Sequence, residues 1–281
     1  MIDQADTLRR LASQETRIIT IASGKDRMGK SSLSVNLSVQ LAKMGNKVLL
    51  LDATQGTVDS ADLLGISSVH SLVDVLNQSK SIQDVVNSSR YGVKLISGVS
   101  CITRLAEISQ EQSSSFLQEL NKLSEADFLV IDTGASNSQV VLDLLFAADA
   151  AVIIMTPETT SIQNSYGLIK LLSQRDRSRL PEIQIVVNRV ESFEQGGMVF
   201  QKVQNALTHF LSLHVKFCGT IIEDSLIRNS GLERIPYVIS HPETKSAVEI
   251  KRLAFSFTQQ IGSKSRGIGV KGFLSRLSNH H

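Results

Sequence analysis

The chain has 281 residues, of which 42% are apolar and 20% are charged, and this balance predicts a globular protein of one or two domains. Its 4 Pro and 17 Gly exclude a collagen-like or low-complexity chain, and its 2 Cys exclude a disulfide framework and an iron–sulfur site. The net charge of +2 is unevenly divided, because residues 250–281 hold six basic residues and no acidic ones, while the rest carries −4. Such a basic end predicts contact with an anionic partner.

The sequence disfavours membrane-spanning and secreted proteins. No apolar run approaches the roughly 20 residues of a membrane span, and the acidic N-terminus is unlike a signal peptide. We therefore expect a cytoplasmic protein.

Short β-branched runs alternate with longer helical patterns along most of the chain, which is typical of strands joined by crossover helices. Seven strands are expected, at residues 17–22, 47–52, 93–97, 128–132, 151–156, 183–188 and 217–222. Helices are expected to start near Lys30, Gln110, Gln139, Ser161, Glu194 and Thr244. This order predicts an α/β fold over residues 16–262, a doubly wound and mostly parallel sheet with helices on both faces. Residues 1–15 and 263–281 are expected to be short appendages.

A phosphate-binding motif follows the first predicted strand. Residues 24–31 read G-K-D-R-M-G-K-S and match G-x-x-x-x-G-K-[ST] between a strand and a helix. In this motif backbone N–H groups bind phosphate oxygens, Lys30 neutralises their charge, and the Ser31 hydroxyl can ligate Mg²⁺. A chance Gly-Lys-Ser turn is the alternative, which the flanking strand and helix disfavour. We predict that ATP or ADP binds with Mg²⁺ at Gly24, Lys25, Asp26, Arg27, Met28, Gly29, Lys30, Ser31 and Ser32.

Lys25 makes this loop resemble the deviant Walker A motif of the MinD/ParA (SIMIBI) group, K-G-G-x-G-K-[ST]. The resemblance implies a P-loop NTPase that forms a homodimer with ATP, in which Lys25 reaches the partner's phosphates as a catalytic residue. The two middle glycines of the motif are replaced by Asp26 and Arg27. Gly adopts positive φ at no steric cost, and a carboxylate near a triphosphate is repelled unless it is paired. Either Arg27 offsets Asp26, or the site is loosened.

Two aspartates end predicted strands where a phosphate-bound Mg²⁺ would lie. Asp52 and Asp132 are expected at the carboxyl edge of the sheet, and we predict that both help Ser31 to hold the ion, with Asp132 also catalytic. A strand-end cap is the alternative reading of either residue alone. The group's segment after the second strand is D-x-D-x-G, but here Thr54 replaces the second Asp, which positions the attacking water. A hydroxyl is a poor general base, so slow ATP hydrolysis and a nucleotide-binding pseudo-enzyme both stay open.

Three later segments carry a longer pattern: D-T-G-A at 132–135, A-A-D at 147–149 and T-P-E-T-T-S-I-Q-N-S-Y-G-L-I-K at 156–170. Together they closely resemble the FlhG family, MinD-like regulators of flagellar number and placement. Asn188 and Arg189, after the sixth predicted strand, match the N-R/K pair that contacts adenine in the wider group. A strand-end turn is the alternative for this pair. The resemblance also leaves flagellar switch-ring proteins open as partners.

The N-terminus matches the D-Q-A-x-x-L-R motif that begins FlhG proteins, through Asp3, Gln4, Ala5, Leu8 and Arg9. The resemblance implies that this segment docks on the signal-recognition-type GTPase FlhF and stimulates it. So short a helix is marginal alone and would order on binding. A frayed terminus is the alternative.

The basic end of the chain carries an apolar stripe. Val270, Phe273, Leu274 and Leu277 recur at helical spacing, and Ile268, Lys271 and Arg276 complete a predicted segment for binding an anionic membrane. Three glycines in six residues each cost a helix about 1 kcal/mol, so we expect this tail to be disordered in water. One tail should bind weakly and two in a dimer more strongly, at the inner face of the cell membrane. A helix packed on the protein's own body is the alternative.

Three functional hypotheses follow. The first is an FlhG-like ATPase switch, dimeric and membrane-bound with ATP and monomeric with ADP. The second is a non-hydrolysing scaffold with the same partners, favoured by Asp26, Arg27 and Thr54. The third is a ParA-type DNA-partitioning ATPase, which the lack of a dense basic run disfavours because nonspecific nucleic-acid binding depends on many phosphate contacts.

Overall fold

The computed structural model describes residues 16–54, 60–67, 70–98, 115–116, 118–120, 122–123, 125–134, 138–259 and 269–278. The strands in these residues form one eight-stranded sheet in the order β3-β4-β2-β5-β1-β6-β7-β8. They are β1 (Arg17–Ala22), β2 (Val48–Ala53), β3 (Asn87–Ser88), β4 (Val93–Ser97), β5 (Phe128–Thr133), β6 (Ala150–Met155), β7 (Glu182–Val190) and β8 (Lys216–Ile222). Only the pair β3 and β4 is antiparallel. The strand order reverses beside β1, as in a doubly wound sheet.

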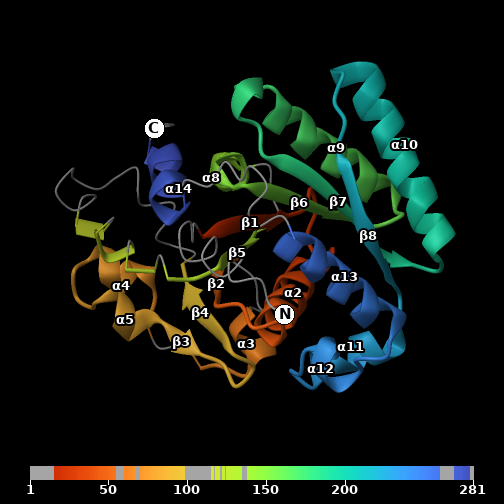
Figure 1. Cartoon of the computed structure of the whole chain (residues 1–281). Coiled ribbons are helices and arrows are strands. Elements are labelled where there is room, and N and C mark those ends of the chain that lie inside the picture. Colours follow the sequence, from red (N-terminus) through yellow and green to blue (C-terminus); the bar gives the residue numbers. More distant parts are fainter. Residues whose placement is uncertain are drawn as a thin grey trace, which may run out of the picture.

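Helices cover both faces of this sheet (Figure 1). The longer ones are α2 (Lys30–Lys43), α8 (Gln139–Ala147), α9 (Thr159–Ser173), α10 (Phe193–Leu211), α13 (Lys245–Gln259) and α14 (Gly269–Ser278). The shorter ones are α3 (Ser60–Leu64), α4 (Leu72–Leu76), α5 (Ile82–Val85), α11 (Ser225–Leu232), α12 (Tyr237–Ser240) and the 3₁₀ turn Arg177–Arg179. The apolar clusters place α2, α3, α12 and α13 on one face, and α4, α5, α8, α9, α10 and α14 on the other.

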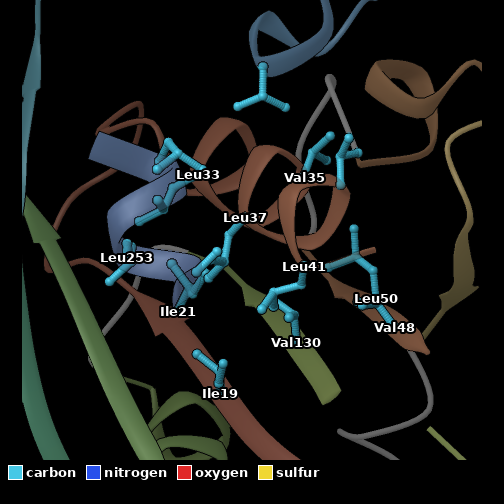
Figure 2. Packing of buried hydrophobic residues seen from close by; sticks show 14 of the residues in the cluster. Ile19, Ile21, Leu33, Val35, Leu37, Leu41, Val48, Leu50, Val130 and Leu253 are labelled. Atoms are coloured by element: carbon cyan, nitrogen blue, oxygen red, sulfur yellow. The ribbon is translucent and has the colours of Figure 1, made fainter. Parts of the chain in front are cut away.

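Strand β1 shows why both faces are covered. Ile19 and Ile21 pack under α2, whereas Ile18 belongs to the cluster on the opposite face, because successive strand residues point to opposite sides. Figure 2 shows Leu37 and Leu41 of α2 pointing toward the sheet. Helix α2 is buried over most of its length between the sheet and α13, which fixes the helix N-terminus that begins the phosphate site.

The predicted fold class is confirmed, and the seven expected strands lie within two residues of their expected ends. Helices α2 and α8 start at Lys30 and Gln139 as expected, and α9, α10 and α13 start within two residues of expectation. The start of a helix expected near Gln110 is a position outside the described residues, so this expectation stays a prediction. Over the described part of the chain, no helix has the length and apolarity needed to cross a bilayer.

Candidate nucleotide and magnesium site

The phosphate loop runs from β1 to α2 and is closely packed against two other parts of the chain. Gly29 has φ of 92°, and a Cβ there would lie 2.3 Å from the side-chain nitrogen of Asn188. A Cβ at Gly24 would lie 2.3 Å from the backbone carbonyl carbon of Asn164 in α9. Side chains at these two motif positions would therefore push the loop out of place.

Lys30 is the buried cation of this loop, with 8% of its surface exposed. Its Nζ donates a hydrogen bond to Ser23 Oγ at 3.2 Å, and Ser23 Oγ donates to the carbonyl of Lys25 at 2.6 Å. Burial lowers the pKa of Lys30, while the charges of Asp132 and Asp26 oppose that shift. A buried ammonium group beside a glycine-bearing loop and a helix N-terminus is suited to binding phosphate.

The two residues that replace the motif's glycines behave differently. Arg27 adopts φ of 60°, the left-handed region that a glycine would occupy freely, and Asp26 does not. A side chain in that region costs about 1–2 kcal/mol. Both side chains are exposed. Arg27 therefore has a backbone conformation that a glycine at this position would adopt without strain.

Asp52 and Asp132 are direct register partners on neighbouring strands, and both are buried. Burial, and secondly the charge of Asp52, raise the pKa of Asp132 to about 7, although the hydroxyls of Ser31 and Ser60 and the charge of Lys30 act against the shift. Asp132 Oδ1 is buried and has no hydrogen-bond partner among the described residues. A hard cation such as Mg²⁺ prefers carboxylate and hydroxyl oxygens. The residues present therefore fit the ion, with Asp132, Asp52 and Ser31 as its candidate holders.

Thr54 lies where the group's second aspartate is expected, and it contacts Asp52. Both its N–H and its hydroxyl donate to Asp52 Oδ1, at 2.9 and 2.7 Å. Ser60, which the sequence analysis did not single out, donates from its N–H to Asp52 Oδ2 at 2.8 Å and from its hydroxyl to Asp132 Oδ2 at 3.0 Å. No motif spacing pointed to Ser60, which follows Thr54 by six residues and lies outside the D-x-T segment.

Lys25 lies at the surface of the chain, where it contacts Glu158 and Thr160. Its Nζ is 3.1 Å from Glu158 Oε2 and donates to Thr160 Oγ1 at 3.2 Å, at the start of α9. The Lys25 and Glu158 side chains are 42% and 55% exposed. Glu158 and Thr160 belong to the segment that resembles the FlhG family, but the sequence assigned them no role.

Asn188 and Arg189 end β7 beside the phosphate loop. Asn188 donates through its side-chain nitrogen to the carbonyl of Met28 at 2.8 Å. Met28 is buried, and its sulfur accepts a hydrogen bond from Ser161 Oγ at 3.2 Å. Arg189 has φ of 55°, and its Nε lies 3.9 Å from Glu223. In this structure Asn188 therefore connects the loop to β7. Ser32, the last of the predicted loop residues, follows Ser31 in the first turn of α2.

Helix α14 contains most of the residues predicted to bind a membrane, and it packs on the body of the protein. Val270, Phe273, Leu274 and Leu277 are buried in one cluster with residues of β2, β5 and α8. Arg276 donates to the carbonyl of Ala147 at the end of α8 at 3.3 Å. Of Lys271 only the backbone is described, and Ile268 and residues 1–15 lie outside the described residues.

For residues 269–278 the expectation of a tail disordered in water is therefore wrong, and the alternative of a helix packed on the body is what the structure shows. Burying four apolar side chains contributes roughly 1.5–3 kcal/mol each, which exceeds the cost of about 1 kcal/mol per glycine. The sequence showed the stripe but not the surface that receives it. The α14 seat, meaning the apolar surface under this helix, still contains a cavity of about 50 Å³.

The sheet order and the loop that follows β1 define the P-loop NTPase fold of the MinD/ParA type. The profile of the AAA domain family (AAA_31) matches residues 16–185, more than half of the chain, and the chain belongs to this family.

Individual relatives agree with this assignment. The chain is 28% identical to the antiactivator FleN of Pseudomonas aeruginosa over 269 residues, 94% of each chain. It is also 28% identical to the flagellum site-determining protein YlxH of Helicobacter pylori, over 93% of this chain and 90% of that protein. The septum site-determining protein MinD from Pyrococcus horikoshii, solved with Mg-ADP, superposes with a TM-score of 0.69 at 26% identity, over 89% and 99% of the two chains. The resemblance to the FlhG family is confirmed.

Proposed function

We propose that this protein is a MinD-like ATP switch that takes part in controlling flagellar number and placement. The observation that carries the proposal is the buried group of Lys30, Asp52 and Asp132 beside the phosphate loop. Likeness to FleN and YlxH along more than 90% of the chain supports the flagellar role. The fit of these residues to phosphate and a hard cation supports ATP or ADP with Mg²⁺ as the ligands.

The chain's own residues divide the work of the site. The loop between Gly24 and Gly29 holds phosphate oxygens, and Lys30 neutralises their charge. Ser31, Asp132 and Asp52 would hold Mg²⁺, which would supply charge stabilisation to the phosphates. Thr54 does not act as a general base, because its hydroxyl donates to Asp52. We therefore expect slow hydrolysis, with water oriented by hydrogen bonds and not deprotonated by a carboxylate at this position.

A non-hydrolysing scaffold is the second candidate, and the same contact of Thr54 favours it. Single-turnover hydrolysis of ATP separates the two candidates when it is measured with lipid and partner present. Turnover above that of a Lys30→Ala variant supports the switch. Turnover equal to that of the variant supports the scaffold.

ATP-dependent dimerisation is part of the proposal, and Lys25 is the residue that would cross between protomers. Its contacts with Glu158 and Thr160 lie at the surface and can be exchanged at little cost. Size-exclusion chromatography with ATP and with ADP tests this step. Dimer formation only with ATP supports it, and an unchanged elution volume contradicts it.

Membrane attachment would require α14 to leave its seat. Two features support this: the cavity of about 50 Å³ under the helix, and its amphipathic pattern, which suits a membrane surface. Cosedimentation with anionic liposomes in the presence of ATP tests this step by comparing the wild type with Phe273→Asp. Phe255→Asp, at an exposed position of α13, is the matched control. Loss in the first variant alone supports α14 as the anchor, and equal binding by both contradicts it.

Docking on the GTPase FlhF is proposed for residues 1–15 on the strength of the D-Q-A-x-x-L-R motif. Deleting these residues should preserve nucleotide binding, since the phosphate loop lies outside them, and should remove stimulation of the GTPase. Stimulation that survives the deletion contradicts the assignment.

A ParA-type DNA function is disfavoured because the sequence lacks a dense basic run. A ParA-family ATPase structure that resembles this chain is 22% identical, and this likeness supports the fold alone.

A further inference from the structure

One serine contacts both carboxylates of the acidic pair. Ser60 is the first residue of α3 and is fully buried. Its N–H donates to Asp52 Oδ2 and its hydroxyl donates to Asp132 Oδ2, at 2.8 and 3.0 Å. Asp52 and Asp132 come from different strands, so Ser60 fixes the position of each relative to the other.

The two carboxylates are held unequally. Asp52 accepts bonds on both oxygens, because Thr54 donates twice to Oδ1 and Ser60 donates to Oδ2. Asp132 accepts from Ser60 on Oδ2, and its buried Oδ1 has no hydrogen-bond partner in the described part of the chain. A buried carboxylate oxygen without a donor is costly unless a ligand satisfies it. Asp132 Oδ1 is therefore the oxygen of this pair that lacks a donor within the described residues, and a cation would satisfy it.

We infer that Ser60 is a positioning residue for the magnesium site, an inference that rests on the proposed nucleotide switch. Its hydroxyl restrains the Asp132 carboxylate so that Oδ1 is available to the ion or to water bound to it. Its N–H, with Thr54, restrains Asp52 beside it. Groups that hydrogen-bond to metal-binding carboxylates orient them, and losing one typically weakens metal binding by about 10- to 100-fold.

Ser60 also places α3 against the site, so a fair control must disturb α3 without touching the carboxylates. Asp62 of α3 offers this control, since its side chain is paired with Arg234 at 3.1 Å at the surface. Asp62→Asn removes that ion pair and leaves Ser60 in place. Ser60→Thr keeps a hydroxyl at the buried position, and Ser60→Cys keeps the side-chain shape with a somewhat larger sulfur but offers a weak donor.

The test is the affinity for ADP measured by calorimetry with Mg²⁺ and with a chelator. The gain in affinity that Mg²⁺ gives should fall about tenfold in Ser60→Ala and Ser60→Cys, and should be retained in Ser60→Thr and Asp62→Asn. A gain in Ser60→Ala equal to that of the wild type would overturn the inference. So would a loss that is as large with the chelator as with Mg²⁺, because it would show damage to the loop and not to the ion site.

Two control measurements distinguish failure of the nucleotide switch from failure of the Ser60 inference. If the wild type binds no ADP under either condition, the proposed nucleotide switch fails before Ser60 is tested. A melting temperature measured for each variant identifies one that does not fold. If Ser60→Ala does not fold, Ser60→Cys against Ser60→Thr still decides, since only the strength of the donor, the larger sulfur and one methyl group differ.

Discussion

The phosphate loop and the α14 seat are held by opposite kinds of contact. The loop depends on directional polar bonds, such as Lys30 to Ser23 and Asn188 to Met28. The α14 seat depends on apolar contacts, surrounds a cavity of about 50 Å³, and has the bond from Arg276 to Ala147 at its edge. Polar bonds of fixed geometry can be satisfied only by a ligand of matching chemistry, whereas apolar side chains can exchange one apolar environment for another. The loop is thus suited to recognising a ligand, and α14 is suited to changing partners.

The largest expected effect breaks the polar region alone. Lys30→Ala removes the buried ammonium beside the loop, and truncating a buried charge that pairs with a ligand costs about 2–5 kcal/mol or more, so ADP affinity should fall about 30-fold or more. Calorimetry measures this change. Lys94→Ala, at an exposed position of β4, is the matched control, and a chain ending at residue 259 should bind ADP as the full chain does. Equal affinity in Lys30→Ala would contradict the phosphate site.

The second largest expected effect is a loss of folding stability when a buried Phe in the apolar region is truncated. Phe128 of β5 and Phe273 of α14 are both buried, and truncating a buried Phe to Ala typically costs about 3–5 kcal/mol. If α14 can leave its seat, the loss in Phe273→Ala cannot exceed the free energy that seats the helix. We expect Phe128→Ala to lose clearly more stability in denaturant unfolding, and Phe273→Ala to resemble deletion of residues 269–281. Equal losses for the two Phe variants would show that α14 is a permanent part of the core.

The sequence predicts features that depend on local patterns, and it misses contacts between residues that lie far apart in the chain. The long strands and α2 were predicted because their patterns are periodic and local, while the five-residue α3 carries little periodic signal. Ser60 was missed because its contact with Asp132 joins residues 72 apart. The pairing of Lys25 with Glu158 joins residues 133 apart and was missed for the same reason. The tail was wrongly expected to be disordered because the receiving surface comes from β2, β5 and α8, which local glycine content cannot reveal.

A smaller expected effect is the pH dependence of the free energy of unfolding, which Asp132 gives to the polar region. Burial, then the charge of Asp52, raise the pKa of Asp132 to about 7, whereas an unfolded aspartate titrates near its usual value of roughly 3.9. Between these values the folded state holds a proton that the unfolded state has lost, so this residue's contribution to the free energy of unfolding falls as pH rises. The slope is at most about 1.4 kcal/mol per pH unit.

Urea unfolding in a chelator at pH 5 and pH 7 measures this slope, and Asp132→Asn should remove that part of it. Because Mg²⁺ needs the ionised carboxylate, its affinity should increase as pH rises through 7. A slope identical in wild type and Asp132→Asn would contradict the assignment.

The smallest expected effect lies between the two regions, at the surface pair of Lys25 and Glu158. Their side chains are 42% and 55% exposed, so solvent screens the pair and limits its worth to between 0 and about 1 kcal/mol. If Lys25 must leave Glu158 to reach a second protomer, Glu158→Gln should favour the ATP-dependent dimer by at most about fivefold for each of the two protomers. Sedimentation equilibrium at 50 mM and 500 mM salt measures this, with Glu243→Gln, at an exposed position before α13, as the control. The advantage should shrink at high salt, because surface pairs are screened. A weaker dimer in Glu158→Gln would instead show that Glu158 acts in the dimer itself, and that its contact with Lys25 does not hold the monomer.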